Sequence, residues 1–148
     1  MSTLFAFLHH LAAFTLASAL AIEFALIRSE LTLASARRLQ VTDIVFGIAA
    51  GALLIIGLLR EFFFEKGASY YFHSHAFLGK LTLFVVVGLM SIIPTMEFLS
   101  WGGALKAGQV PAIGAKKLRL VTAVIHGEMF AIVIILLCAA IMARGGWV

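Results

Sequence analysis

The 148-residue chain is 63% hydrophobic and 12% charged, and its mean hydropathy is +1.11. Soluble domains carry roughly a quarter charged residues and about half apolar residues, so this composition excludes a soluble protein. The formal net charge is +4, but the loop charges described below account for this excess by membrane topology. No nucleic-acid partner is therefore expected.

Four apolar stretches are each long enough for the roughly 20-residue helix that crosses a hydrocarbon core. They cover residues 4–27, 44–64, 77–99 and 120–142. They predict an all-α polytopic membrane protein whose residues 1–148 form a single four-helix transmembrane domain in the lipid bilayer. The first stretch is expected to stay uncleaved, because no Lys or Arg precedes it and it runs past the small residues near Ala19 to Ile27.

Lysine and arginine concentrate in two of the three connections. These basic residues are Arg28, Arg37 and Arg38 in the first connection, then Lys106, Lys116 and Lys117 in the third, with Arg119 at the next helix edge. The second connection balances Lys66 with Glu61 and Glu65. Short cytoplasmic loops are enriched in Lys and Arg, so both termini are predicted on the non-cytoplasmic side of a bacterial inner membrane.

Ionisable residues inside the apolar stretches are the candidates for a site. A charged side chain near the bilayer centre costs on the order of 3 kcal/mol, so such residues usually face protein or a water-filled cavity. A rise of about 1.5 Å per residue divides them by depth. The outer group is His9, His10, Arg60 and Lys80, and the inner group is Glu23, Glu97, His126 and Glu128.

The outer group suits a negatively charged, redox-active ligand. An imidazole can be the axial ligand of a haem iron, and Arg60 and Lys80 can pair with haem propionates or another carboxylate. Adjacent helical residues point about 100° apart, so only one of His9 and His10 can face the bundle axis. The alternative is that Arg60 and Lys80 extend to the interface, beside the acidic residues of the second connection.

The inner group suits proton transfer or helix cohesion. Glu23 follows His9 by fourteen residues, which places it on nearly the same helix face and about 21 Å deeper. His126 and Glu128 are about 200° apart around their helix. A ladder of His9, then His126 or Glu128, then Glu23 can carry protons across a membrane. The alternative is a set of interhelical hydrogen bonds made by protonated carboxyl groups.

Small residues four positions apart indicate close packing between membrane helices. This spacing links Gly47 with Gly51, and it recurs in Ala123, Gly127 and Ala131. These helix faces are therefore predicted to pack closely, inside the bundle or against other subunits, and to have no catalytic or binding role.

Several segments resemble a bacterial family of predicted membrane proteins of unknown function. They are residues 8–11 (LHHL), 60–67 (REFFFEKG) with the tyrosine pair at 70–71, and 79–81 (GKL). The layout is more distantly similar to four-helix membrane protoporphyrinogen oxidases and to the membrane domain of copper-resistance proteins. Resemblance to the oxidases implies that His9 matches their haem-associated histidine, Lys80 their essential lysine and Glu128 their acidic residue.

This sequence departs from the oxidases in two places. The aromatic, arginine-rich end of their first helix is absent, and residues 126–128 (HGE) replace their Asn-Glu pairing. The resemblance therefore extends to haem or tetrapyrrole binding rather than to porphyrinogen oxidation. Cys138 is the single cysteine, so haem would be held without covalent attachment, as haem b.

Three functions from different classes follow from these patterns. The first is a haem-dependent membrane oxidoreductase, whose partner is a tetrapyrrole or quinone-like molecule. Its expected catalytic residues are Lys80 and Glu128; its expected cofactor-binding residues are His9, His10 and Arg60, with His9 as the metal ligand. The second is a small proton or metal-ion transporter that uses the buried carboxylates and His126. The third is a structural subunit of a homo-oligomer or larger membrane complex.

Overall fold

A computed structural model describes residues 2–64 and 68–144, and all regular structure in these ranges is helical. The long helices are α1 (Ser2–Arg28), α2 (Leu33–Leu59), α4 (His75–Ser100) and α6 (Ala115–Ala143). A π-helical segment, η1 (Arg60–Phe64), continues α2, and the short helices α3 (Ala68–Phe72) and α5 (Gly102–Lys106) lie in the second and third connections. The all-α fold class is confirmed.

Four segments are long and apolar enough to cross a membrane, as predicted. They run over Thr3–Arg28, Leu33–Phe64, His75–Lys106 and Ala115–Ala143. Large apolar side chains on their outer surface are exposed, among them Phe14 and Phe130. An apolar surface of this extent is stable only against lipid or another apolar surface.

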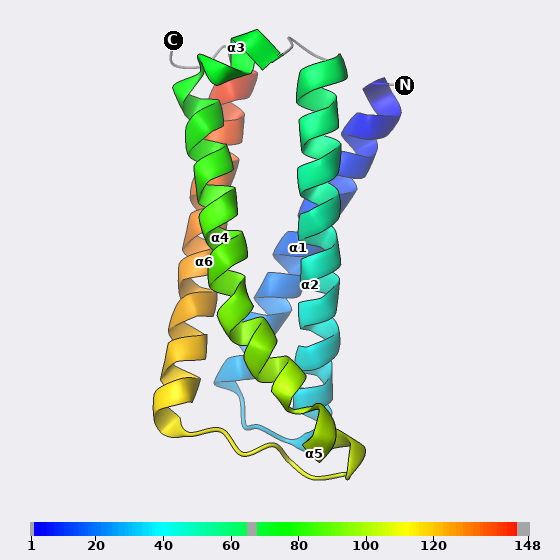
Figure 1. Ribbon diagram of the computed structural model, residues 1–148, viewed down its shortest axis with the longest axis vertical. Coiled ribbons are helices and arrows are strands. Elements are labelled where there is room, and N and C mark those ends of the chain that lie inside the picture. The colour runs from blue at the N-terminus through cyan, green and yellow to red at the C-terminus, as the bar shows by residue number, and fades with distance from the viewer. Residues whose placement is uncertain (1, 65–67, 145–148) are drawn as a thin grey trace.

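The helices are arranged as two pairs, α1 with α2 and α4 with α6 (Figure 1). The pairs stand apart at the end that carries α3 and approach each other at the end that carries α5 (Figure 1). These ends are called the α3 end and the α5 end below. Helix α1 begins and α6 finishes at the α3 end, while the basic connections lie at the α5 end (Figure 1). The side of the membrane that each end faces remains a prediction.

Helix α2 begins at Leu33 rather than at residue 44, where the second apolar stretch begins. Its start is fixed by a capping box: the Ser35 N–H donates to Thr32 Oγ1, and the Thr32 N–H donates to Ser35 Oγ. Arg37, Arg38 and Asp43 interrupt the apolar run without interrupting the helix. Asp43 consequently lies inside a transmembrane helix.

Buried positions in the long helices recur every three or four residues, the spacing of one helix face. They include Leu16, Leu20, Glu23 and Ile27 on α1; Ala36, Leu39, Asp43 and Phe46 on α2; and Val121, Ile125 and Glu128 on α6. Three of these core positions carry acids. The carboxyl groups thus stand where the helix pattern otherwise places apolar side chains.

The small-residue faces differ in what they contact. A Cβ at Gly127 would come within 3.2 Å of the Met90 Cε, so α6 lies close to α4 there. Gly47 and Gly51 have open space at their Cβ positions, and no described part of the chain makes the predicted helix contact at this pair. The reason is angular, because Phe46 and Ala49 carry the buried face of α2 and the two glycines point away from it.

Candidate functional site

A cavity of about 140 Å³ lies between all four long helices, toward the α3 end. Three polar side chains line it, namely His9, Glu61 and Lys80. The other described lining residues are alanine, leucine, isoleucine, phenylalanine and one glycine. It is called the outer cavity below. An apolar pocket with a few convergent polar groups is the usual form of a small-molecule site.

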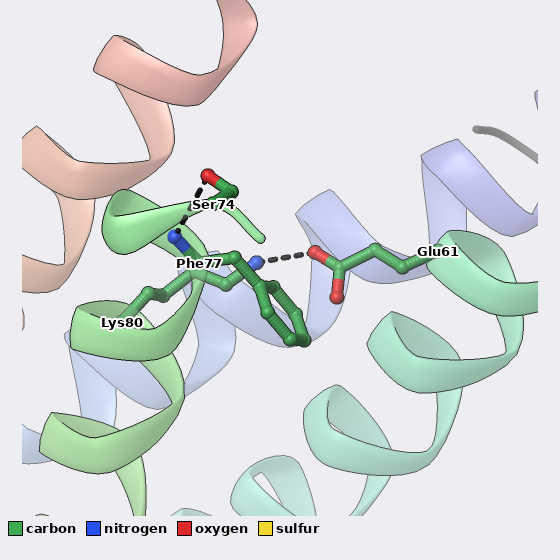
Figure 2. A network of polar contacts seen from close by, with 4 residues as sticks. All are labelled: Glu61, Ser74, Phe77 and Lys80. Atoms are coloured by element: carbon green, nitrogen blue, oxygen red, sulfur yellow. Dashed lines mark hydrogen bonds and ion pairs between the residues drawn. The ribbon is translucent and has the colours of Figure 1, made fainter. Parts of the chain in front are cut away.

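Lys80 and Glu61 form an ion pair across the outer cavity (Figure 2). The Lys80 ammonium donates to Oε1 of Glu61 and lies 5.3 Å from the centroid of the Phe77 ring. The first turn of α4 is capped by Ser74, whose Oγ accepts the Phe77 N–H at 3.4 Å (Figure 2). Glu61 therefore neutralises the Lys80 ammonium, which was expected from the sequence to bind an anionic ligand.

Glu61 reaches this position from η1, a π-helical segment. Such segments are rare and frequently occur at functional sites. Arg60, the first residue of η1, is half-buried and is not among the described residues that line the cavity. Glu61 was expected in the second connection, and Arg60 was expected beside Lys80 in the site. In the structure it is Glu61 that lies beside Lys80 on the cavity wall.

His9 and His10 occupy different environments. The His9 ring lies against Gly57 of α2, where an added Cβ would be 3.2 Å from the His9 Cε1 and 3.5 Å from Nδ1. The His10 side chain is exposed, and its Nδ1–H donates to the Ala6 carbonyl at 2.6 Å. The 100° offset between neighbours thus puts His9 on the cavity wall and His10 on the outer surface.

Three acidic side chains are buried deeper in the bundle, at 1% exposure for Glu23, 4% for Asp43 and 1% for Glu128. They come from α1, α2 and α6, and they lie close enough that they would repel one another if all were ionised. Thr95 of α4 donates its hydroxyl to Asp43 Oδ1 at 3.0 Å. This acidic cluster therefore draws on all four long helices.

The acidic cluster is incompletely satisfied. Both carboxyl oxygens of Glu128 and Oε1 of Glu23 are buried and accept no hydrogen bond from the described residues. The two ion pairs seen among the described residues, Lys80 with Glu61 and Lys117 with Glu97, do not involve the cluster. Buried polar atoms are nearly always hydrogen-bonded, and leaving one unpaired costs about 1–3 kcal/mol or more when it is charged. The cluster thus has capacity for a proton, a cation or water.

His126 is not part of the acidic cluster. Its side chain is exposed, and its ring makes an edge contact with Phe24, with centroids 4.9 Å apart. The sequence left His126 and Glu128 as alternatives for the interior position. Because the two residues are about 200° apart around α6, only one of them can face the bundle interior, and that residue is Glu128.

Asp43 is the functional candidate that sequence reasoning missed, because the second apolar stretch appeared to begin after it. Two signals mark it. The Thr32-x-x-Ser35 capping box starts the helix early, and Leu39, Asp43 and Phe46 share the spacing of one buried face. A polar residue at a position of the buried, otherwise apolar face of a helix therefore marks a candidate functional residue.

A further set of polar contacts, made by Glu97 and Gln40, lies at the α5 end. Glu97 accepts the Trp101 Nε1–H at 3.0 Å and pairs with Lys117 at 3.1 Å, whose side chain is largely exposed. Gln40 donates to the Phe98 carbonyl at 2.6 Å. These contacts hold α2, α4 and α6 together at this end and link the buried Glu97 to solvent.

The outer cavity is small for a tetrapyrrole. Sites for drug-sized ligands measure about 300–1,000 Å³, whereas this cavity measures about 140 Å³. Lys80, expected to pair with a propionate, is already paired with Glu61. The described ranges also contain no group of three or more His, Cys, Asp or Glu side chains arranged to hold a metal ion. Haem b stays a prediction from the sequence.

The chain belongs to the family described as "Predicted membrane protein (DUF2214)", which matches residues 1–146. The predicted resemblance to a membrane family of unknown function is confirmed, and the chain is a membrane protein with four apolar helices suited to a lipid bilayer. A relationship to protoporphyrinogen oxidases or copper-resistance proteins is not shown. No curated protein and no solved structure matches the chain.

Proposed function

We propose that this member of the DUF2214 family transfers protons through its helical bundle, in a bacterial inner membrane, with Glu23, Asp43 and Glu128 as the exchange site. The observation that carries the proposal is the burial of three carboxyl groups in the bundle, two of which, Glu23 and Glu128, have oxygens that accept no hydrogen bond from the described residues. Ionisable residues inside membrane bundles mark proton relays and ion paths.

The electrostatics of the acidic cluster favour a proton as its ligand. Three ionised carboxylates in a medium of low dielectric constant are strongly destabilising unless their charge is compensated. The ion pairs of Lys80 and Lys117 are made with other carboxylates, and the described residues include no group of three or more acids, histidines or cysteines arranged to hold a metal ion. A proton neutralises a carboxylate with no coordination shell and also supplies the missing hydrogen-bond donor.

A proton path also needs polar groups or a cavity on both sides of the acidic cluster, and the bundle has one on each side. Toward the α5 end, Glu97 lies about 3 Å of rise beyond Thr95 on α4, on the other side of that helix, and pairs with the exposed Lys117. Toward the α3 end, Ile132 lines the outer cavity and lies one helical turn from Glu128, a rise of about 6 Å. The acidic cluster thus stands between a solvent-linked carboxylate and a cavity.

Helix cohesion alone is the competing account, and the unpartnered oxygens argue against it. Interhelical hydrogen bonds between protonated carboxyl groups would occupy those oxygens. Among the described residues, the cluster has one interhelical hydrogen bond, in which the Thr95 hydroxyl donates to Asp43 Oδ1. A purely structural Glu128 would be less stabilising than an apolar residue of the same size, so its presence requires another role.

Proton flux into liposomes tests the proposal. The purified protein is reconstituted with an internal pH-sensitive dye, and a potassium diffusion potential drives proton movement. We expect flux above that of empty liposomes, with at least a tenfold reduction in Glu128→Gln and in Glu23→Gln. Glutamine preserves the side-chain size and removes the exchangeable proton.

The matched control is Glu30→Gln, since Glu30 is an exposed glutamate in the connection after α1. Its flux should equal that of the unmodified protein. Wild-type flux no greater than that of empty liposomes would contradict the proposal, as would equal flux in all four proteins.

A further inference from the structure

The outer cavity is a second site, separate from the acidic cluster, and its shape and polarity specify a ligand class. Its volume of about 140 Å³ is close to the 150 Å³ or so at which an apolar protein cavity accommodates benzene. A single six-membered ring therefore matches the cavity in size, whereas a macrocycle is far larger than the cavity.

The polar groups of the cavity suit a neutral ligand. Lys80 and Glu61 compensate each other's charge, so an anion would have to displace Glu61 from the ammonium group. An ammonium carries three N–H donors, and the Glu61 contact uses one of them. Lys80 can therefore donate to a neutral oxygen acceptor without losing its partner, and the His9 imidazole lies on the same cavity wall.

The wall of the outer cavity is open toward the bilayer. Its lining includes the exposed residues Ala17, Leu54 and Leu136, from α1, α2 and α6. A ring that enters between these side chains can keep an apolar tail in the hydrocarbon region. The ligand is accordingly expected to be dissolved in the membrane.

Ring size, neutral oxygen acceptors and an apolar tail together describe one class of molecule. We propose that the outer cavity binds the headgroup of a membrane-soluble quinone, with Lys80 donating a hydrogen bond to a ring carbonyl and the isoprenoid tail leaving between α1, α2 and α6. This proposal concerns binding alone, and it stands or falls separately from proton transfer by the acidic cluster.

Saturable binding of a radiolabelled ubiquinone with one isoprene unit, measured on the protein in nanodiscs, tests the proposal. We expect one molecule per chain. Ala13→Phe places a ring inside the cavity and should weaken binding at least tenfold. Ala21→Phe adds the same ring to an exposed position on the same helix and should leave the affinity unchanged.

A second pair of variants covers the case in which Ala13→Phe does not fold. Gly57→Ala presses on His9, whereas Gly51→Ala meets open space. Weaker binding in Gly57→Ala alone would support the site. Binding no greater than that of empty nanodiscs would overturn the proposal, as would equal affinities across each pair. Farnesol, which has the tail without the ring, should not compete, and full competition would also overturn it.

Discussion

Two buried glutamates in this bundle stand in opposite electrostatic situations. Glu61 has a cationic partner in Lys80, whereas the Glu128 oxygens have no hydrogen-bond partner in the described part of the chain. Removing one member of a buried ion pair is destabilising, whereas replacing a buried carboxyl group that lacks hydrogen-bond partners with an apolar group of similar size can be neutral or stabilising. The same substitution should therefore have opposite effects at the two positions.

Glu128→Met is expected to stabilise the protein against unfolding by about 1–3 kcal/mol, because it removes unsatisfied polar atoms from the core. Unfolding in mild detergent, followed by circular dichroism, measures the change. A loss of stability comparable to that of a core truncation would show that Glu128 is well satisfied in the folded protein.

Glu61→Met is expected to destabilise the protein by about 2 kcal/mol, below the usual 3–5 kcal/mol for a fully buried pair, because the Lys80 side chain is 18% exposed. The double variant with Lys80→Met should recover most of this loss. Additive losses in the double-mutant cycle would mean that the two side chains do not interact.

At the scale of elements, α2 carries the largest difference between expectation and structure. Its apolar pattern predicted the span that begins at residue 44, but the helix starts at the Thr32 cap and ends in the π-helical η1. Hydropathy detects contact with lipid and not helical conformation, so amphipathic first turns are invisible to it. A π-helical segment has no recognised sequence pattern, and the placement of Glu61 could not be predicted.

Two glycines of α2 should respond differently to alanine. Gly51→Ala is expected to stabilise the helix by up to about 1 kcal/mol, since alanine has the higher helix propensity and the site is open. Gly57→Ala should give no such gain, because the new Cβ crowds the His9 ring. Thermal unfolding of both variants compares them, and equal gains would show that His9 moves aside freely.

At the scale of the whole molecule, the sequence predicted four helices, an all-α bundle and the membrane environment, because composition and length decide these properties. It also predicted His9 and Glu23 on one face of α1, and both now line the interior. It could not predict that Asp43 joins Glu23 and Glu128, or that Glu61 neutralises Lys80. Those contacts join different helices, and no local pattern encodes them.

The orientation of the bundle remains a prediction, with the α3 end outside the cytoplasm. Single cysteines at His73 and Gln109, exposed positions at the α3 and α5 ends, can be placed in a Cys138→Ala background. An impermeant maleimide should label position 73 in intact spheroplasts and position 109 only after lysis. Labelling of position 109 in intact spheroplasts, and of position 73 only after lysis, would show that the α3 end faces the cytoplasm.

The central claim is that the acidic cluster holds an exchangeable proton. Infrared spectroscopy of the protein in lipid, under the conditions of the flux measurement, tests it most directly. We expect a carbonyl band of protonated carboxylic acid that shifts in D₂O and loses intensity in Glu23→Gln and in Glu128→Gln. The absence of such a band, or a band unchanged by both substitutions, would contradict it.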